Sequence, residues 1–387
     1  MRLKIWFILI MVVLSSCKKN NDNQTTSNSE DTSTPAYYTF SGQIGTNDNS
    51  TLIAFDSSVI ICGNNDTNIS ILKISKSGNQ IWRKDIYAGN NCRASAITES
   101  SNHELYICGR TSRNYSTSSW DILLVKTDAT GDTLWTKTFG SKQEDYGYQI
   151  IRTQDGNLLI GGISYRDTTS VFCDIYLIKV NPDGDTLWTQ SYTEPEQQDP
   201  FHLMETQNGE YLITGTNEDN SPTGRKLLFL KLNANGTLLW EKTIGPVWKW
   251  GYSTIELSNG DLVTCGQYNP GGYTNVMIIK TDNQGNVIWE NEFGLNNLSE
   301  SGNSIKQNAD GSFIITGSSY DAASMQADII LLKVDANGNQ LFLKKFGSSI
   351  SDNGVNVIKD NNDDNIITGN YNGSIFMTRT DNNGKFK

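Results

Sequence analysis

The sequence has little positive charge and few histidines. Its 42 Asp and Glu residues outnumber its 31 Lys and Arg residues, which gives a net charge of −11. The basic residues form no cluster, and this argues against nucleic acid or an anionic membrane surface as a ligand. Only two histidines are present, His103 and His202. A metal site at His202 would need partner ligands that the sequence does not show, so we predict no metal and no cofactor.

Long apolar runs are also lacking, since the run from Ile5 to Leu14 holds only ten residues. A helix needs ~20 apolar residues to cross a bilayer core of about 30 Å, so this run is too short to span one. It follows Arg2 and Lys4 and precedes small residues, as in a signal peptide. The ending Leu14-Ser15-Ser16-Cys17 resembles a bacterial lipobox. Residues 1–17 are therefore predicted as a lipoprotein signal peptide and Cys17 as the acylated residue, with an ordinary signal peptide as the alternative.

Lipidation at Cys17 would decide where the protein is located. Stable attachment takes more than one acyl chain, and the lipoproteins that this motif resembles carry several. We predict a place in the bacterial cell envelope, in the outer membrane, with the lipid anchor as the only membrane contact and the leaflet left open. Residues 18–39 contain almost no apolar side chains before position 36, so they are predicted as a flexible polar tether.

Residues 40–387 consist of seven imperfect copies of one unit, shown in full from Asp121 to Gly162. Short β-branched runs end in turn residues, and Asp155-Gly156 separates two of them, as in a β-hairpin. Each copy predicts four strands and no helix. A basic residue ends one strand and an aromatic residue opens the next. A glycine that closes an apolar strand recurs at Gly63, Gly109, Gly162, Gly215, Gly266, Gly317 and Gly369.

This period, near 50 residues, predicts a β-propeller with one four-stranded blade per copy. The first aromatic strand, at Phe40, stands alone, and the chain ends after its seventh basic strand near Arg379. The first strand can therefore complete the last blade, which closes the ring and leaves no strand edge open. We predict one closed, all-β, seven-bladed domain, with a linear β-solenoid as the alternative.

The pattern D-x-x-G-x-x-x-W, as in Asp128, Gly131 and Trp135, is similar to the repeats of extracytoplasmic bacterial propellers, including the seven-bladed propeller repeat. It is more distantly similar to the tryptophan-docking repeats of quinoproteins. The resemblance covers residues 40–387 and implies a fold, but not an activity, because one propeller scaffold hosts many functions. A quinoprotein dehydrogenase is disfavoured for two reasons. The chain has no vicinal cysteine pair, and it has seven copies of the repeat, where those enzymes usually have eight.

Aligning the repeats also assigns the cysteines and His202. Three cysteines, Cys62, Cys108 and Cys265, precede the strand-closing glycine and are predicted to be small core residues. Cys92 and Cys173 lie in connections of adjacent blades and either pair or stay free, because disulfide geometry is narrow. We expect the register of His202 to line a wet central channel. Its other members are mostly polar: Ser50, Ala96, Gln149, Ser253, Ser304 and Asn356.

Loop lengths give the clearest indication of a functional face. Hairpin turns are short and alike, whereas the connections at 110–120, 216–226 and 267–275 are long and dissimilar. In a four-stranded blade these connections and the links between blades emerge on one face, which we call the long-loop face. Loops carried on a rigid scaffold commonly bear function, so we predict recognition there.

Aromatic residues depart from the repeat on this face. Trp248 and Trp250 stand where other copies have polar residues. Together with Tyr252, Tyr146 and Tyr148 they are predicted to form a platform for sugar rings or a protein partner. The alternative is that the two indoles fill a gap between blades.

Acidic residues gather on the same face. Paired carboxylates can hydrolyse glycosides, but acids also cap loops. We therefore predict a monomeric, lipid-anchored, non-enzymatic binding or scaffold module for a glycan or protein partner. A surface glycan hydrolase or lyase that uses these carboxylates is the alternative. The acids are Glu144, Asp145, Glu194, Glu196, Asp199, Glu300 and Asp352.

Overall fold

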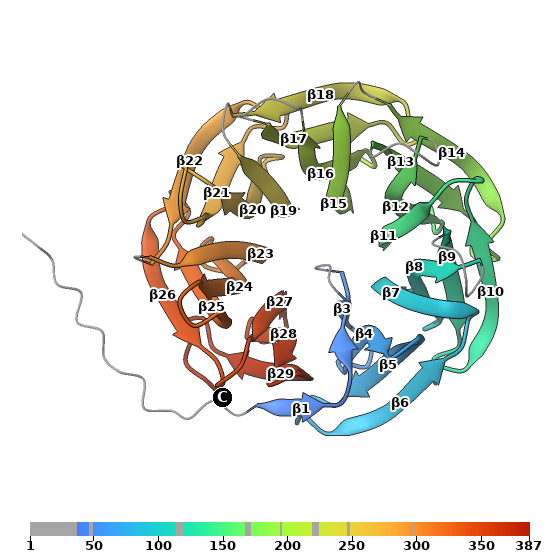
Figure 1. The fold of residues 1–387 in the computed structure, drawn as a ribbon, viewed down its shortest axis with the longest axis horizontal. Coiled ribbons are helices and arrows are strands. Elements are labelled where there is room, and N and C mark those ends of the chain that lie inside the picture. The colour runs from blue at the N-terminus through green and yellow to red at the C-terminus, as the bar shows by residue number, and fades with distance from the viewer. Residues whose placement is uncertain are drawn as a thin grey trace, which may run out of the picture. The chain divides into compact units, whose positions relative to one another are not determined.

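The computed structural model describes residues 37–45, 49–113, 119–166, 172–193, 196–218, 224–245, 248–295 and 297–387. The predicted signal peptide, Cys17 and most of the predicted tether lie outside these ranges. The unit of residues 34–387 is a ring of seven antiparallel sheets (Figure 1). The prediction of an all-β, seven-bladed propeller is thus confirmed. Within the described ranges, no helix is long and apolar enough to cross a membrane.

Each blade has four main strands, ordered from the centre of the ring to its rim, and the blade of β3 has a short fifth strand (Figure 1). The inner strands are β3 (Thr51–Ile53), β7 (Asn90–Glu99), β11 (Asp145–Arg152), β15 (Gln197–Glu205), β19 (Lys249–Glu256), β23 (Ser299–Gln307) and β27 (Asn353–Lys359). The second strands are β4 (Val59–Asn65), β8 (Leu105–Ser112), β12 (Leu158–Tyr165), β16 (Tyr211–Glu218), β20 (Leu262–Tyr268), β24 (Phe313–Asp321) and β28 (Asn365–Tyr371).

The third strands are β5 (Asn68–Ile74), β9 (Trp120–Thr127), β13 (Cys173–Val180), β17 (Arg225–Leu232), β21 (Asn275–Thr281), β25 (Gln326–Val334) and β29 (Ser374–Thr380). The outer strands are β6 (Gln80–Ile86), β10 (Thr133–Phe139), β14 (Thr186–Tyr192), β18 (Leu238–Ile244), β22 (Val287–Phe293), β26 (Gln340–Phe346) and β1 (Tyr38–Phe40). A short strand, β2 (Gln43–Ile44), precedes β3 and also pairs with β4.

The core lies between the blades. Second and third strands read as continuous buried runs, such as Leu158 to Ile163, because a neighbouring blade covers each of their two faces. Outer strands are half-buried to exposed, with more alternation along the chain. The strand-closing cysteines Cys62, Cys108 and Cys265 are fully buried, as predicted.

The ring closes through the N-terminal strand. β1 pairs antiparallel with β29, with Tyr38 opposite Met377 and Phe40 opposite Ile375. Next to β1, the ring of Tyr37 stacks on Tyr371 with 4.4 Å between centroids. The prediction that the first strand completes the last blade is confirmed.

Contacts between strands and turns explain two of the repeating positions. The basic residue of each third strand forms an ion pair of 2.7–3.2 Å with an acid in or beside the hairpin between the first two strands of its own blade. These pairs hold the inner half of the blade to its third strand. They are Lys73–Asp56, Lys126–Glu104, Lys179–Asp155, Lys231–Glu210, Lys280–Asp261, Lys333–Asp310 and Arg379–Asp360.

The repeating glycine of the outer hairpin has a different role. It has a positive φ and lies against the aromatic ring of the preceding blade, so that a Cβ atom there would come within 2.0–3.2 Å of the ring. This contact joins one blade to the next all round the rim, and Gly78 makes it with Tyr38 of the closing strand. The other pairs are Gly131–Trp82, Gly184–Trp135, Gly236–Trp188, Gly285–Trp240, Gly338–Trp289 and Gly384–Phe342.

Candidate functional site

Six of the seven inner strands contain a β-bulge. In β11, for example, the pairing with β12 skips one residue between Gly147 and Gln149. A bulge adds a residue and re-aims its side chain, and here the added residue is Tyr148. The corresponding residues of the other blades are Ser95, Phe201, Tyr252, Asn303 and Val355.

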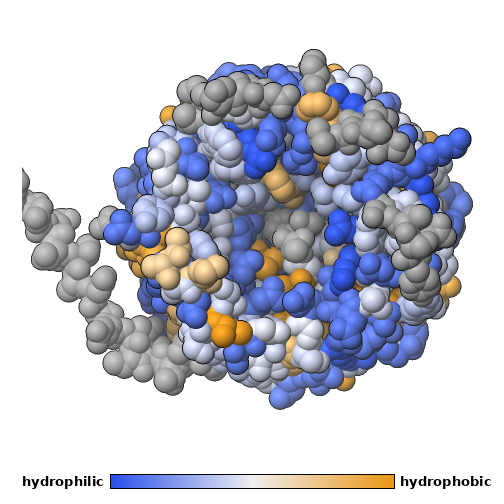
Figure 2. Space-filling model, viewed as in Figure 1, coloured by the Kyte–Doolittle hydropathy of each residue, from blue (hydrophilic) through white to orange (hydrophobic). Residues whose placement is uncertain are grey.

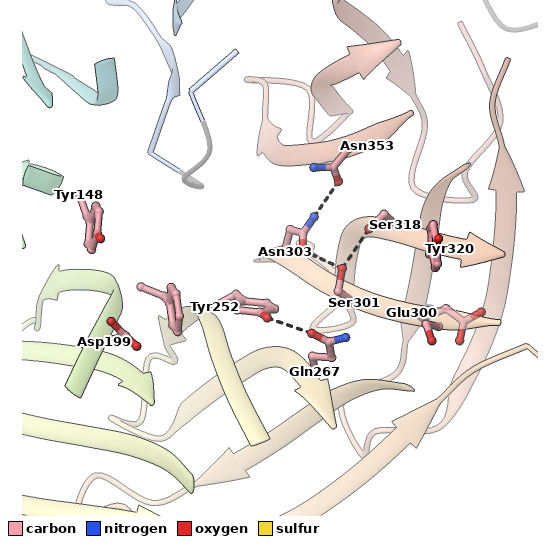
Figure 3. Close-up of a pocket in the computed structure, with 12 residues that line it drawn as sticks. Tyr148, Asp199, Tyr252, Gln267, Glu300, Ser301, Asn303, Ser318, Tyr320 and Asn353 are labelled. Atoms are coloured by element: carbon pink, nitrogen blue, oxygen red, sulfur yellow. Dashed lines mark hydrogen bonds between the residues drawn. The ribbon is translucent and has the colours of Figure 1, made fainter. Parts of the chain in front are cut away.

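Four of these bulge residues line a cavity of about 610 Å³, which we call the central pocket. Its lining comes from first strands around the ring axis and from the second strands β20 and β24 (Figure 3). Figure 2 shows the molecule hollowed at the centre of the ring. The lining residues are Tyr148, Asp199, Phe201, Tyr252, Gln267, Ser299, Glu300, Ser301, Asn303, Ser318, Tyr320 and Asn353.

The expectation that the His202 register lines a wet central channel is wrong, and the bulges explain why. Its seven members are at most 5% exposed, so they do not form a wet channel wall. Several of their polar side chains instead bond to the neighbouring blade, as where Asn356 Nδ2 donates to Ser50 Oγ at 2.8 Å. In four of the bulged strands the residue before this register lines the pocket instead, so the pocket register there lies one position earlier.

The central pocket opens on the long-loop face. The long connections run back to the starts of the inner strands, where Glu300 N donates to Thr274 O at 2.8 Å. Asn269 N likewise donates to Trp248 O at 2.9 Å. These bonds place the connections and the blade links on the same side of the ring, as predicted.

One wall of the central pocket is aromatic. Tyr148, Phe201 and Tyr252 come from three successive inner strands, and the Phe201 and Tyr252 rings meet edge to face at 5.2 Å. Tyr252 OH donates to Gln267 Oε1 at 3.0 Å, which fixes the ring. Burial raises the pKa of Tyr252 to about 12, against a smaller opposing effect of Arg225. The phenol is therefore neutral at physiological pH.

The opposite wall consists of amides and hydroxyls (Figure 3). Asn303 Nδ2 donates to Asn353 Oδ1 at 2.9 Å, and Ser301 Oγ donates to Asn303 Oδ1 at 3.0 Å. The hydroxyls of Ser301 and Ser318 are bonded at 3.1 Å. This network holds the amides in fixed orientations beside the cavity.

Two carboxyl groups are among the described residues that line the pocket. Asp199 accepts bonds from Gln197 Nε2 at 2.9 Å and from Cys173 Sγ at 3.7 Å. Glu300 accepts one from Ser319 Oγ at 3.0 Å. Burial raises the pKa of both carboxyls, so the site favours their protonated forms more than water does.

Two other acids of the long-loop face act as loop caps. Asp145 Oδ2 accepts a bond from Ser141 N at 2.6 Å, and Asp352 Oδ1 accepts one from Asn372 N at 2.7 Å. Glu144 accepts a bond from the Tyr146 hydroxyl. Glu194 lies outside the described residues, and Glu196 is partly exposed.

The five predicted aromatic residues fall into three groups. Tyr148 and Tyr252 lie in the central pocket. Trp248 and Trp250 pack around the Arg225 guanidinium, which is 5.5 and 5.4 Å from their ring centroids. That guanidinium also pairs with Glu218 at 2.8 Å.

Tyr146 belongs to a second cation–π cluster. The Arg110 guanidinium lies 4.6 Å from its ring centroid and 4.9 Å from that of Trp120. Because Tyr146 and Trp250 each precede a bulge residue by two positions, both clusters adjoin the pocket along β11 and β19. Sequence reasoning missed Phe201 and Asn303, and their only signal is the position one residue before the His202 register.

All five described cysteines are free thiols. Cys92 and Cys173 therefore do not pair, and the sequence alternative of two free thiols is the one observed. Both are buried.

Comparison with known proteins identifies the fold class. No protein-family model matches the chain, and no curated protein matches its sequence. Among solved structures, puromycin hydrolase matches with a TM-score of 0.60 and 10% identity over 90% of this chain and 54% of that one. This chain thus spans about half the length of that enzyme.

Two other structures match with TM-scores of 0.50. An ulvan lyase of polysaccharide lyase family PL25 shares 12% identity over 76% of this chain and 77% of that one. Drosophila plexin A, in complex with semaphorin 1b, shares 10% identity over 89% of this chain and 88% of that one. At such identities the likeness shows the β-propeller fold alone.

Proposed function

We propose that this protein binds a glycan in the central pocket without cleaving it, and that lipid on Cys17 holds it in the bacterial cell envelope. The observation that carries the proposal is the pairing of an aromatic wall, Tyr148, Phe201 and Tyr252, with a wall of oriented amides and hydroxyls. Aromatic faces pack against the C–H faces of sugars, while amides and hydroxyls bond to sugar hydroxyls. The cavity of about 610 Å³ is within the usual range of ligand pockets.

Two acids outside the central pocket and the phenols inside it support binding over catalysis. Asp145 and Asp352, which belong to the acids of the long-loop face, hold backbone N–H groups. The phenols of Tyr148 and Tyr252 have pKa values raised by burial, so they are poor general bases at neutral pH.

A glycan hydrolase or lyase is the second candidate. The observation in its favour is Asp199, whose pKa is raised by burial inside the pocket, as a general acid requires. Turnover of a polysaccharide that is lost in Asp199→Asn would establish this candidate and refute the non-enzymatic proposal.

The binding proposal is tested by titration calorimetry with a panel of oligosaccharides. We expect Phe201→Ala and Tyr252→Ala each to weaken binding at least about tenfold, because each removes a packing surface for the sugar. Tyr273→Ala is the matched control, since Tyr273 is an exposed aromatic residue of the 267–275 connection outside the pocket lining. Unchanged affinity in both pocket variants, with loss in a Trp248→Ala, Trp250→Ala double variant, would move the site to the Arg225 cluster. Binding to a protein but to no glycan would favour a protein partner.

A further inference from the structure

A second cavity adjoins the central pocket. It measures about 450 Å³ and shares Ser318, Tyr320 and Asn353 with the pocket lining. From there it extends outward over β24 and β28, along Asp352 and Asn370. The two cavities are therefore direct neighbours with part of their lining in common.

The described lining of these two cavities contains no Lys, Arg or His. It does contain three carboxyl groups, those of Asp199, Glu300 and Asp352. When ionised these groups repel a ligand carboxylate or sulfate, and when protonated they still offer it no countercharge.

Two arginines influence the pocket tyrosines without lining the pocket. The charge of Arg110 opposes the rise that burial causes in the pKa of Tyr148, and the charge of Arg225 does the same for Tyr252. Each guanidinium lies over two aromatic rings, and Arg225 also has Glu218 as its ion-pair partner. Neither arginine lines the two cavities, and Glu218 compensates the charge of Arg225.

We infer that the ligand is an uncharged oligosaccharide that occupies both cavities, and that acidic glycans are excluded. This inference rests on the proposed glycan-binding function and adds the chemical class and the length of the ligand. Neutral hydroxyls suit the amide wall, whereas a buried anion without a partner carries a large desolvation cost.

The charge part is tested with one matched ligand pair. The neutral oligosaccharide that binds best is compared with its uronic acid derivative, made by oxidation of the primary hydroxyls. We expect at least about tenfold weaker binding of the derivative at physiological salt, and a smaller difference in Asp199→Asn, which removes one carboxylate at constant size. Equal or tighter binding of the derivative overturns the inference but leaves glycan binding intact. If no glycan, neutral or acidic, binds at all, the proposed function itself fails.

The length part is tested with a series from the monosaccharide to the hexasaccharide. We expect affinity to rise until both cavities are filled. Tyr320 lines both cavities and is 39% exposed, so Tyr320→Ala should fold normally and weaken binding of the longer members more than binding of the monosaccharide. Tyr273→Ala again serves as the control. Equal affinity for all lengths, or no effect of Tyr320→Ala on the hexasaccharide, would contradict occupation of the second cavity.

Discussion

Replacing Gly184 by Ala tests whether the contacts between outer-hairpin glycines and aromatic rings hold neighbouring blades together. Gly184 has φ +79°, and a Cβ atom there would lie 2.6 Å from Trp135 Cη2 of the preceding blade. Gly156 is the matched control, because it also follows an Asp in a tight turn and has φ +82°, but its Cβ would meet no atom within 4 Å. Both glycines donate their N–H to the carbonyl three residues back.

The two substitutions share one cost and differ in another. An alanine in the left-handed region costs roughly 1–2 kcal/mol at either position. At Gly184 the new methyl group must also displace the Trp135 ring, which costs about 1–3 kcal/mol in a packed site. We therefore expect Gly184→Ala to lower the free energy of unfolding by about 2 kcal/mol more than Gly156→Ala does. For a domain of this size that difference corresponds to roughly 3 °C in the unfolding midpoint.

Thermal and urea unfolding of the two variants beside the wild type measure the difference. Tryptophan fluorescence of the native state reports whether the Trp135 ring has moved. Equal destabilisation of the two variants would refute the idea that the rim contact constrains the blades, and would leave the glycine explained by its positive φ alone.

Four further outcomes are expected. A chain that starts at residue 42 lacks β1, so it should unfold at a lower temperature than a chain that starts at residue 37. It should also self-associate through the edge of β29 that β1 covers. Identical unfolding temperatures and a monomeric shorter chain would contradict ring closure. Because burial raises the pKa of Asp199, its ionisation costs stability as the pH rises above about 4. Thermal unfolding at two pH values should therefore show a higher midpoint temperature for Asp199→Asn than for the wild type at about pH 8, and no such increase at about pH 3. Burial also raises the pKa of the Cys62 and Cys108 thiols, so a thiol reagent should modify them only after unfolding, and fast modification of the native protein would be inconsistent with this structure. Cys17→Ala should move the protein from the membrane to the soluble fraction of fractionated cells, and continued membrane association would exclude lipidation at this residue.

The repeats made the fold predictable from the sequence. Seven copies of one pattern reinforce each other, and the unpaired strand at Phe40 indicated how the ring closes. The structure supplies the physical reason for the pattern, since Gly131 contacts Trp82 and Lys126 pairs with Glu104. Residues that recur in this way serve the scaffold.

The site was only partly predictable, because a β-bulge leaves no mark in the sequence. Without the bulge in β15, the strand alternation predicts His202 toward the channel, whereas the structure turns Phe201 toward the pocket. Tyr148 and Tyr252 were predicted as site residues because they are aromatic, although their position depends on the same bulges. For Trp248 and Trp250, the position depends on Arg225 in another part of the chain, which spacing alone does not indicate.

The most direct test of glycan recognition is a crystal structure of the protein with the neutral oligosaccharide that binds best. We expect a sugar ring packed on Phe201 and Tyr252, with hydroxyls bonded to Asn303 and further sugars passing Tyr320 into the second cavity. A sugar bound on Trp248 and Trp250 instead, or an empty central pocket in crystals grown with saturating ligand, would contradict the account.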